Sequence, residues 1–376
     1  MRKVFLFVLI MGLFLLGNIL PAAAEFKTKV KDWDVTLGGM IVTDTYFVMH
    51  DKNYPGSGHH VDDDADFYFW TEDTAFFATF ENGPFRVYFD IRTDQFEYAY
   101  AEWDFGSGKL LFGHNEPLTW EPIHMPPPLK SGIGQMVGPP LGAQVKLSVP
   151  VGPVTLHALA IEQDYYYSYI DVGTGTVEQD AELPILETKV DIPIGPVTTS
   201  LLGGYSSYAQ VDGTGKSYDI TSTLVGLAAH YVKGPFSLHG TLFHDVNDYN
   251  HGGDWRQKSV LYGASCDLYF GGPSYDEESD SIKDSEYIGW ALSTSYLFSP
   301  KFDLHLGVSG GNTEDDYGNK DGAIGYEIAA GIHFNQFVSV IPFFHITDWG
   351  TREPVDAAEI DEGTTTCFGA EWFFLW

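Results

Sequence analysis

Apolar and polar residues alternate with a period of two along most of the chain after residue 24. In the stretch 302–309, Phe, Leu, Leu and Val alternate with Asp, His, Gly and Ser, and 85–92, 288–298 and 324–333 repeat the pattern. Successive side chains of a strand point to opposite faces, so each stretch predicts a strand with one apolar and one polar face. No apolar run after residue 24 approaches the roughly 20 residues that a spanning helix needs. An all-β fold is therefore expected.

The polar faces of these strands carry groups that a dry protein core excludes. The stretch 85–92 places Arg86, Tyr88, Asp90 and Arg92 on one face. A soluble β-sandwich would bury one face of every strand in its core, where unpaired charges are costly. A transmembrane barrel instead turns its apolar, aromatic-rich face to lipid and its polar face to a wet lumen. The alternation thus favours a transmembrane antiparallel β-barrel.

Short and long connections between the strands alternate. The tight ones contain Gly-Pro or Pro, at 82–84, 151–153, 194–196, 233–235 and 299–301. The long, polar ones fall at 50–64, 114–140, 168–182, 248–256, 271–285, 311–321 and 350–363. This asymmetry is typical of a membrane barrel with short periplasmic turns and long extracellular loops.

The number of strands follows less directly. The alternating segments are odd in number, whereas a closed single-chain barrel of this class has an even number of strands. The doubtful region lies between Ser259 and Glu286, and it includes an alternating segment at 257–270. We expect about 16 strands, with 18 as the alternative, and a barrel of either size leaves an aqueous channel.

The first 24 residues read as a targeting signal. Arg2 and Lys3 precede an apolar run from 4 to 20, and Pro21 leads into three alanines, the small-residue pattern that signal peptidase cleaves. We predict a signal peptide at 1–24, cleavage near Ala24, and a single barrel domain at 25–376. The alternative is an uncleaved membrane anchor.

Charge and cysteine content exclude several classes of protein. The chain has 52 acidic and 20 basic residues and a formal charge of −32, which disfavours a nucleic-acid binder. Its two cysteines, Cys266 and Cys367, are too few for a disulfide-stapled or Cys-rich zinc protein, and we expect both to be free because they lie on distant strands. No spacing indicates a catalytic site, a metal site or a cofactor, so an enzyme is not expected.

The last strand carries a resemblance to a known class. Aromatic side chains share one face up to the final residue, at Phe368, Trp372, Phe374 and Trp376. The chain here resembles bacterial outer-membrane β-barrels, whose terminal aromatic strand is read by the assembly machinery. The resemblance implies the outer membrane of a Gram-negative bacterium. An ordinary aromatic edge strand is the alternative, although it would be prone to aggregation in water.

The layout also resembles general diffusion porins. A tight turn at 105–108, a strand at 109–113 and a long Pro-rich segment at 114–140 follow one another, and in porins the loop after the fifth strand folds into the lumen. The resemblance implies a constriction loop at 114–140 and is compatible with a homotrimer. Expected pore-lining residues are Arg86, Tyr88, Asp90, Arg92, Glu116, Glu121, His124 and Lys130; the alternative is a solvated strand face.

The acidic excess falls mostly in the long loops. The acidic residues expected at the pore mouth are Asp62, Asp63, Asp64, Asp276, Glu277, Glu278, Asp315 and Asp316. Negative charge at a pore mouth attracts cations, which predicts modest cation selectivity. Alternatively, these loops are merely solvated, or they bridge divalent cations to lipopolysaccharide.

The sequence therefore predicts an outer-membrane porin for passive diffusion of small hydrophilic solutes and ions. Two alternatives stay open. One is a substrate-specific channel or an uptake barrel for a hydrophobic compound. The other is a structural or adhesive barrel that does not conduct.

Overall fold

The computed structural model describes residues 25–50, 66–92, 95–119, 142–163, 178–180, 183–211, 215–247, 274–276, 279, 281–355 and 358–375. These residues form strands and connections, and no helix occurs among them. Within the same ranges, no helical segment has the length and hydropathy needed to cross a membrane.

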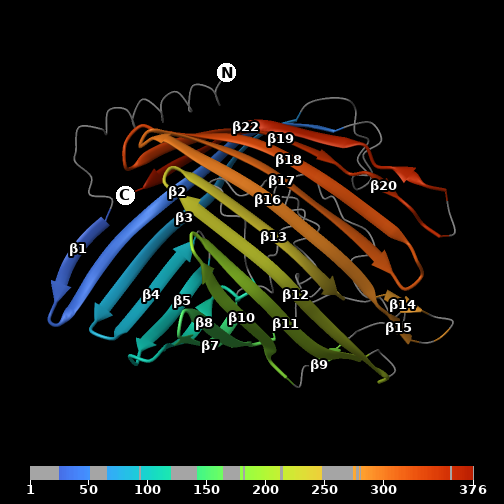
Figure 1. Ribbon diagram of the computed structural model, residues 1–376, viewed down its shortest axis with the longest axis horizontal. Helices are drawn as coiled ribbons and strands as arrows, with labels where there is room; N and C mark the ends of the chain where they lie inside the picture. The colour runs from blue at the N-terminus through green and yellow to red at the C-terminus, as the bar shows by residue number, and fades with distance from the viewer. Residues whose placement is uncertain are drawn as a thin grey trace.

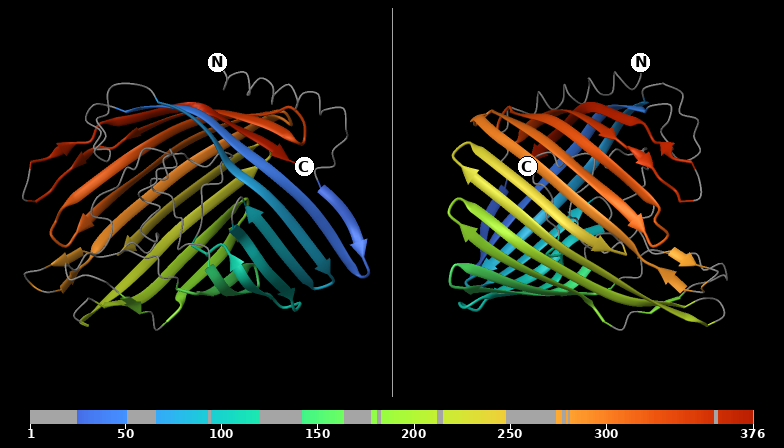
Figure 2. Two further views of the ribbon diagram at one scale, coloured as in Figure 1. Left: turned by 180° about the vertical axis from the view of Figure 1, so that it is seen from behind. Right: turned by 45° about the vertical axis from the view of Figure 1, so that its right-hand side comes forward.

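Sixteen long strands pair antiparallel with their neighbours and close into a barrel (Figure 1). In order around the barrel they are β2 (Trp33–His50), β3 (Asp66–Asn82), β4 (Phe85–Arg92), β5 (Gln95–Asp104), β6 (Lys109–Asn115), β7 (Gly142–Val151), β8 (Val154–Ile161), β10 (Ile185–Ile194), β11 (Val197–Val211), β12 (Ser217–Lys233), β13 (Phe236–Val246), β16 (Ser285–Ser299), β17 (Phe302–Asp315), β18 (Lys320–His333), β19 (Val338–Asp348) and β22 (Thr364–Leu375). Pairing of β22 with β2 closes the ring. The strands are strongly inclined to the barrel axis, as closure requires (Figure 2).

The predicted count of 16 strands is confirmed, and the alternative of 18 is wrong. Strand β13 pairs directly with β16, from Phe236 opposite Tyr296 to Val246 opposite Glu286. This pairing leaves no place in the wall for a strand from the doubtful region. The segment 257–270 itself lies outside the described residues.

Alternation in the sequence becomes alternation between the inside and the outside of the barrel. In β12, Leu224 is 1% exposed whereas its neighbour Val225 is 67% exposed. Large apolar side chains are exposed around the whole wall, among them Phe112, Leu201, Leu242, Leu292 and Phe344. Such an apolar exterior suits contact with lipid and would be unfavourable in water.

The two ends of the barrel differ as the turn chemistry predicts. At one end, here called the turn end, Gly-Pro pairs make two-residue turns in which Gly83, Gly152, Gly195 and Gly234 have φ between 56° and 63°. Glycine occupies this left-handed region without the steric penalty of a Cβ. The opposite end, called the loop end, carries the longer connections. One of them is shorter than predicted: 311–321 shrinks to the four residues between Asp315, the end of β17, and Lys320, the start of β18.

Six short strands lie outside the main wall, and five of them belong to the loop-end connections. These five are β9 (Glu178–Asp180), β14 (Ser274–Asp276), β15 (Ser281–Lys283), β20 (Thr351–Arg352) and β21 (Ile360–Asp361). The sixth, β1 (Glu25–Val30), makes a hairpin with the start of β2. Strands β1 and β22 occupy the same edge of β2 end to end, because Glu25 lies opposite Gly38 and Leu375 lies opposite Met40.

Candidate functional site

The row Arg86, Tyr88, Asp90 and Arg92 lies on the inner face of β4. Its outward neighbours Phe85, Phe89 and Ile91 are 49%, 37% and 42% exposed, whereas Asp90 is 5% exposed. Residues of this row also interact with one another. Arg92 Nε lies 3.8 Å from Asp90 Oδ2, and the Tyr88 hydroxyl donates to the same oxygen at 3.5 Å. Arg86 Nε lies 3.5 Å from Glu81 of β3. The predicted row therefore faces the lumen as a set of paired charges.

Two further tyrosines, which the sequence reading missed, complete this patch from β5. Tyr100 lies opposite Tyr88 and Tyr98 lies opposite Asp90, so all four side chains share the inner face. The Tyr88 ring centroid is 5.4 Å from that of Tyr100 and 6.3 Å from that of Tyr98. The Tyr98 hydroxyl donates to Glu116 Oε1 at 2.5 Å. The available signal was the inverted alternation of 98–101, where the two tyrosines face inward and alternate with outward alanines.

The start of the predicted constriction loop is tied to the inner wall by Glu187 of β10. The carboxylate of Glu187 accepts hydrogen bonds from the backbone N–H of Leu118, the N–H of Thr119 at 3.1 Å and the Thr119 hydroxyl at 2.5 Å. Glu187 is 1% exposed and Thr119 is 0% exposed. The loop residues Glu121, His124 and Lys130 lie outside the described residues.

An apolar strip on the inner wall surrounds this anchor. Buried apolar side chains run from β8 to β16, and Leu118 of the loop packs with them; the wall members are Leu159, Ile161, Ile185, Leu202, Leu224, Ala228, Phe243 and Tyr287. This strip is apolar although it lies on the inner face. The alternation in the sequence therefore cannot distinguish it from a row of residues that faces lipid. Leu118 and the strip supply a hydrophobic contact next to the Glu187 hydrogen bonds.

Basic residues inside the barrel are confined to one side. Among the described residues of the sixteen wall strands, the lysines and arginines on the inner face all lie between β4 and β10: Arg86, Arg92, Lys109, Lys146 and Lys189. The remaining strands carry inward acids and histidines instead. Asp303 of β17 bonds His305 at 2.5 Å and His333 at 2.7 Å, and Glu327 lies 3.6 Å from His345. The lumen wall is therefore polarised from one side to the other.

The acidic loop residues have several different environments. Asp315 is 8% exposed and accepts hydrogen bonds from the backbone N–H of Tyr317 and of Asn319, at 3.0 and 2.9 Å. Asp316 accepts from the Asp284 N–H at 3.1 Å, and Asp276 lies 3.5 Å from Lys283 Nζ. These groups hold the loops together at the loop end. Asp62, Asp63, Asp64, Glu277 and Glu278 lie outside the described residues.

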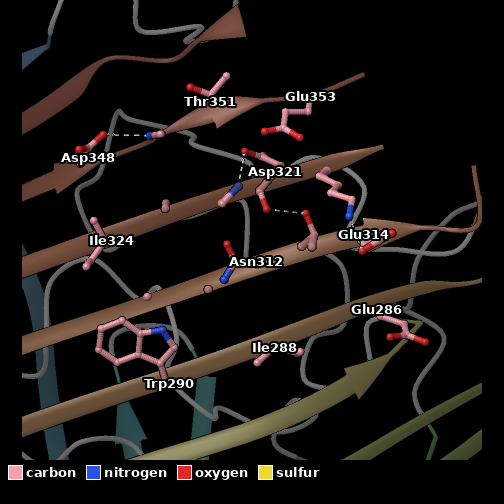
Figure 3. A pocket seen from close by; sticks show the side chains of 17 residues that line it. Glu286, Ile288, Trp290, Asn312, Glu314, Asp321, Ile324, Asp348, Thr351 and Glu353 are labelled. Carbon is pink, nitrogen blue, oxygen red and sulfur yellow. Dashed lines mark hydrogen bonds and ion pairs between the residues drawn. The ribbon is translucent and has the colours of Figure 1, made fainter. Parts of the chain in front are cut away.

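A pocket of about 670 Å³ lies on the outer face at the loop end, over β16, β17 and β18 (Figure 3). Ile288, Trp290 and Ile324 form its apolar part, and Glu286, Asn312, Glu314, Asp348 and Glu353 surround its polar part. Lys320 Nζ is paired with Glu314 Oε2 at 3.1 Å. The pocket marks the level at which the outer wall changes from apolar to acidic.

The terminal aromatic row lies on the outer face of β22. Phe368 stacks on Phe47 of β2 with a centroid distance of 5.1 Å, and Trp372 Nε1 donates to Thr45 Oγ1 at 3.2 Å. Phe374 shares that face, and Trp376 lies outside the described residues. These contacts join the last strand to the first strand of the ring. The Cys367 thiol is fully buried and forms no disulfide within the described residues, whereas Cys266 lies outside them.

Comparison with known proteins gives structural matches only, since no family model and no curated sequence matches. The outer-membrane channel DcaP of Acinetobacter baumannii is 18% identical with a TM-score of 0.65, covering 94% of this chain and 100% of that chain. In-vitro folded OmpT of Vibrio cholerae is 12% identical with a TM-score of 0.59, covering 93% and 99%. An anion-selective porin from Comamonas acidovorans is 13% identical with a TM-score of 0.56, covering 91% and 100%. The chain thus has the 16-stranded fold of bacterial outer-membrane porins.

Proposed function

We propose that the protein is an outer-membrane porin through which small hydrophilic solutes and ions diffuse passively. The observation that carries this proposal is the division of one closed barrel into an apolar outside and an inside lined by paired charges and hydroxyls. Sixteen strands enclose more space than their own inward side chains fill. Permeation then depends on lumen width and charge and involves no covalent step.

The segment 114–140 narrows the channel in this proposal. Supporting it, the first turn after β6 is held to the inner wall by Glu187, three strands away around the barrel. A loop that begins on the inner wall continues inside the barrel more readily than one that begins above the rim. The tyrosine and arginine patch on β4 and β5 faces the same space, so the two elements together would set selectivity.

Cation preference is the finer part of the proposal. It is supported by the inward acids on β17 and β18, where no inward lysine or arginine occurs in the described strands, and by the net charge of −32. The Comamonas porin of similar fold is anion-selective, so the fold itself does not decide the sign.

Purified protein in a planar lipid bilayer tests both parts of the proposal. We expect stepwise currents and, under a KCl gradient, a reversal potential that favours K⁺. Replacing Asp62, Asp63 and Asp64 by Asn should lower the K⁺ to Cl⁻ permeability ratio, because it removes negative charge that attracts cations. We expect a decrease of only roughly twofold, because charge beyond ~8 Å from the ion path is screened. Asp219→Asn, at an exposed position of β12, is the control. Anion preference would refute the selectivity, and absence of current would refute the channel in favour of a structural or adhesive barrel.

The proposed location is the outer membrane of a Gram-negative bacterium, reached after removal of residues 1–24. The aromatic face of β22 would be read by the assembly machinery. The acidic residues around the outer pocket, including Glu286 and Glu314, lie where divalent cations could join the protein to lipopolysaccharide. A hydrophobic-compound uptake barrel is less well supported, because the patch on β4 and β5 is charged.

A homotrimer is proposed from the short wall between β4 and β8. Strands β4, β6 and β8 have 8, 7 and 8 residues. At ~3.3 Å per residue and a tilt of ~40°, such strands span about 20 Å, less than the ~25 Å apolar band of an outer-membrane barrel. A neighbouring copy would cover this wall and its exposed Phe112 and Leu156. OmpT of Vibrio cholerae has a trimer form. Light scattering of the detergent complex is expected to give three chains, and a single chain would contradict the trimer.

A further inference from the structure

We infer that the inner patch formed by β4, β5, β6 and β7 is a binding subsite for a ring-shaped, polyhydroxylated solute such as a saccharide. The inference rests on the proposed channel function and adds a substrate class to it. It is carried by three features that occur together: aromatic ring faces, buried acceptors that lack a hydrogen-bond donor, and a nearly balanced local charge.

The aromatic faces come from Tyr88, Tyr98 and Tyr100. Guanidinium groups already lie over two of them, since Arg86 is 5.8 Å from the Tyr88 centroid and Arg92 is 5.8 Å from the Tyr98 centroid. Among the described residues, no guanidinium lies over Tyr100. Its partner on β6 is Gly113, and a Cβ there would fall 2.7 Å from Tyr100 Cα. Gly113 therefore places no side chain of β6 against Tyr100. Sugar rings stack their C–H faces on aromatic rings in this way.

Two acceptors next to these rings lack a donor. Asp90 and Gln144 are each 5% exposed, and neither Asp90 Oδ1 nor Gln144 Oε1 has a hydrogen-bond partner in the described structure. Gln144 lies opposite Gly113, so it shares the inner face with Tyr100, and its Nε2 donates to the Glu116 carbonyl at 3.2 Å. Leaving a buried acceptor unpaired costs roughly 1–3 kcal/mol. A solute that supplies two hydroxyl donors would remove that cost.

The charge balance of the patch favours a neutral solute. Arg92 is paired with Asp90, Arg86 with Glu81, and Lys109 with Glu102 at 2.9 Å. The carboxylate of Glu116 adds one negative charge and Lys146 of β7 adds one positive charge, so these two groups keep the local charge nearly balanced. A cationic solute would have to compete with Arg86 and Arg92 for the ring faces. Hydroxyl groups both donate and accept, so a sugar can satisfy the two acceptors and use the guanidinium donors.

Current block by a sugar tests the subsite in the same bilayer assay. Maltotriose is expected to reduce the wild-type current in a saturable manner. Tyr100→Ala should raise the half-blocking concentration of maltotriose by about tenfold, because one contact between the sugar and an aromatic ring is lost. Tyr100→Phe keeps the ring and should retain block. Asp90→Asn should also weaken block. Tyr205→Ala, an exposed outward tyrosine on β11, controls for folding and should behave as wild type.

The outcomes separate the subsite from the channel. If no variant and no wild-type sample conducts, the proposed function fails. If wild type conducts without saturable block by maltotriose, or if Tyr100→Ala is blocked as well as wild type, the channel stands and the saccharide subsite is refuted. Stronger block by glucuronate than by the neutral sugar would also refute it, because the patch would then recognise a charge.

Discussion

Replacing Glu187 by alanine is expected to increase single-channel conductance and current noise. The variant removes an acceptor that holds three donors at the first turn after β6: two backbone N–H groups and the Thr119 hydroxyl. Hydrogen bonds to a charged group contribute about 1.5–3 kcal/mol each, so several kcal/mol of loop anchoring would be lost. Every factor of ten in the ratio of anchored to released loop corresponds to about 1.4 kcal/mol. The released state should therefore become well populated.

Two variants define the control for this experiment. Thr188→Ala alters the adjacent outward residue of β10 and should conduct as wild type. Glu187→Gln keeps one acceptor oxygen and should give an intermediate conductance. If Glu187→Ala folds and conducts with wild-type amplitude and noise, the segment that follows Thr119 does not narrow the lumen.

Replacing Gly369 by valine should prevent or strongly weaken barrel closure. Gly369 of β22 lies opposite Tyr46 of β2, at the seam where the last strand meets the first. A Cβ at this position would lie 2.2 Å from the Thr45 carbonyl oxygen and 2.4 Å from Tyr46 Cβ. Neither the backbone nor a Cβ can move aside without displacing a strand, and overpacking of this kind costs about 1–3 kcal/mol or more. We expect loss of the compact, heat-modifiable band in gel electrophoresis and a lower urea midpoint.

The neighbouring residue provides the matched control for Gly369. Ala370 lies on the outer face of the same strand, so Ala370→Val places the same side chain toward lipid and should fold normally. Equal folding of Gly369→Val and Ala370→Val would show that the seam tolerates a side chain and that the close approach at Gly369 has no energetic consequence.

The wall of the barrel was predictable because one rule, inside and outside alternation, applies independently in every strand. The row on β4 shows this: Arg86 to Arg92 could be assigned to one face from eight residues alone. The parity of the strand count added a second constraint, which marked the region between Ser259 and Glu286 as doubtful but left 16 and 18 strands both open. Both inferences need only local pattern and the requirement that a barrel close.

Contacts between distant segments were not predictable in this way. Glu187 lies in an alternating strand, which indicates that it points inward, but its partners are 68 and 69 residues away. A local sequence pattern carries no information about contacts with residues so far away along the chain. Asp315 illustrates a different failure, since an acidic residue in a loop looks solvated until the backbone N–H groups of Tyr317 and Asn319 are found bonded to it. Tyr98 and Tyr100 were missed because aromatic residues were expected to face lipid.

Once residues 1–24 are removed, as proposed above, the end-to-end arrangement of β22 and β1 along β2 would make the chain nearly cyclic. Only Gly39 separates the β2 partners of Leu375 and Glu25. A circular permutant could therefore connect these two ends through a short linker and open instead within 51–65, while keeping every strand pair of the wall. Such a permutant would move both free termini to the opposite side of the membrane, where fusion partners could be displayed without interrupting the ring.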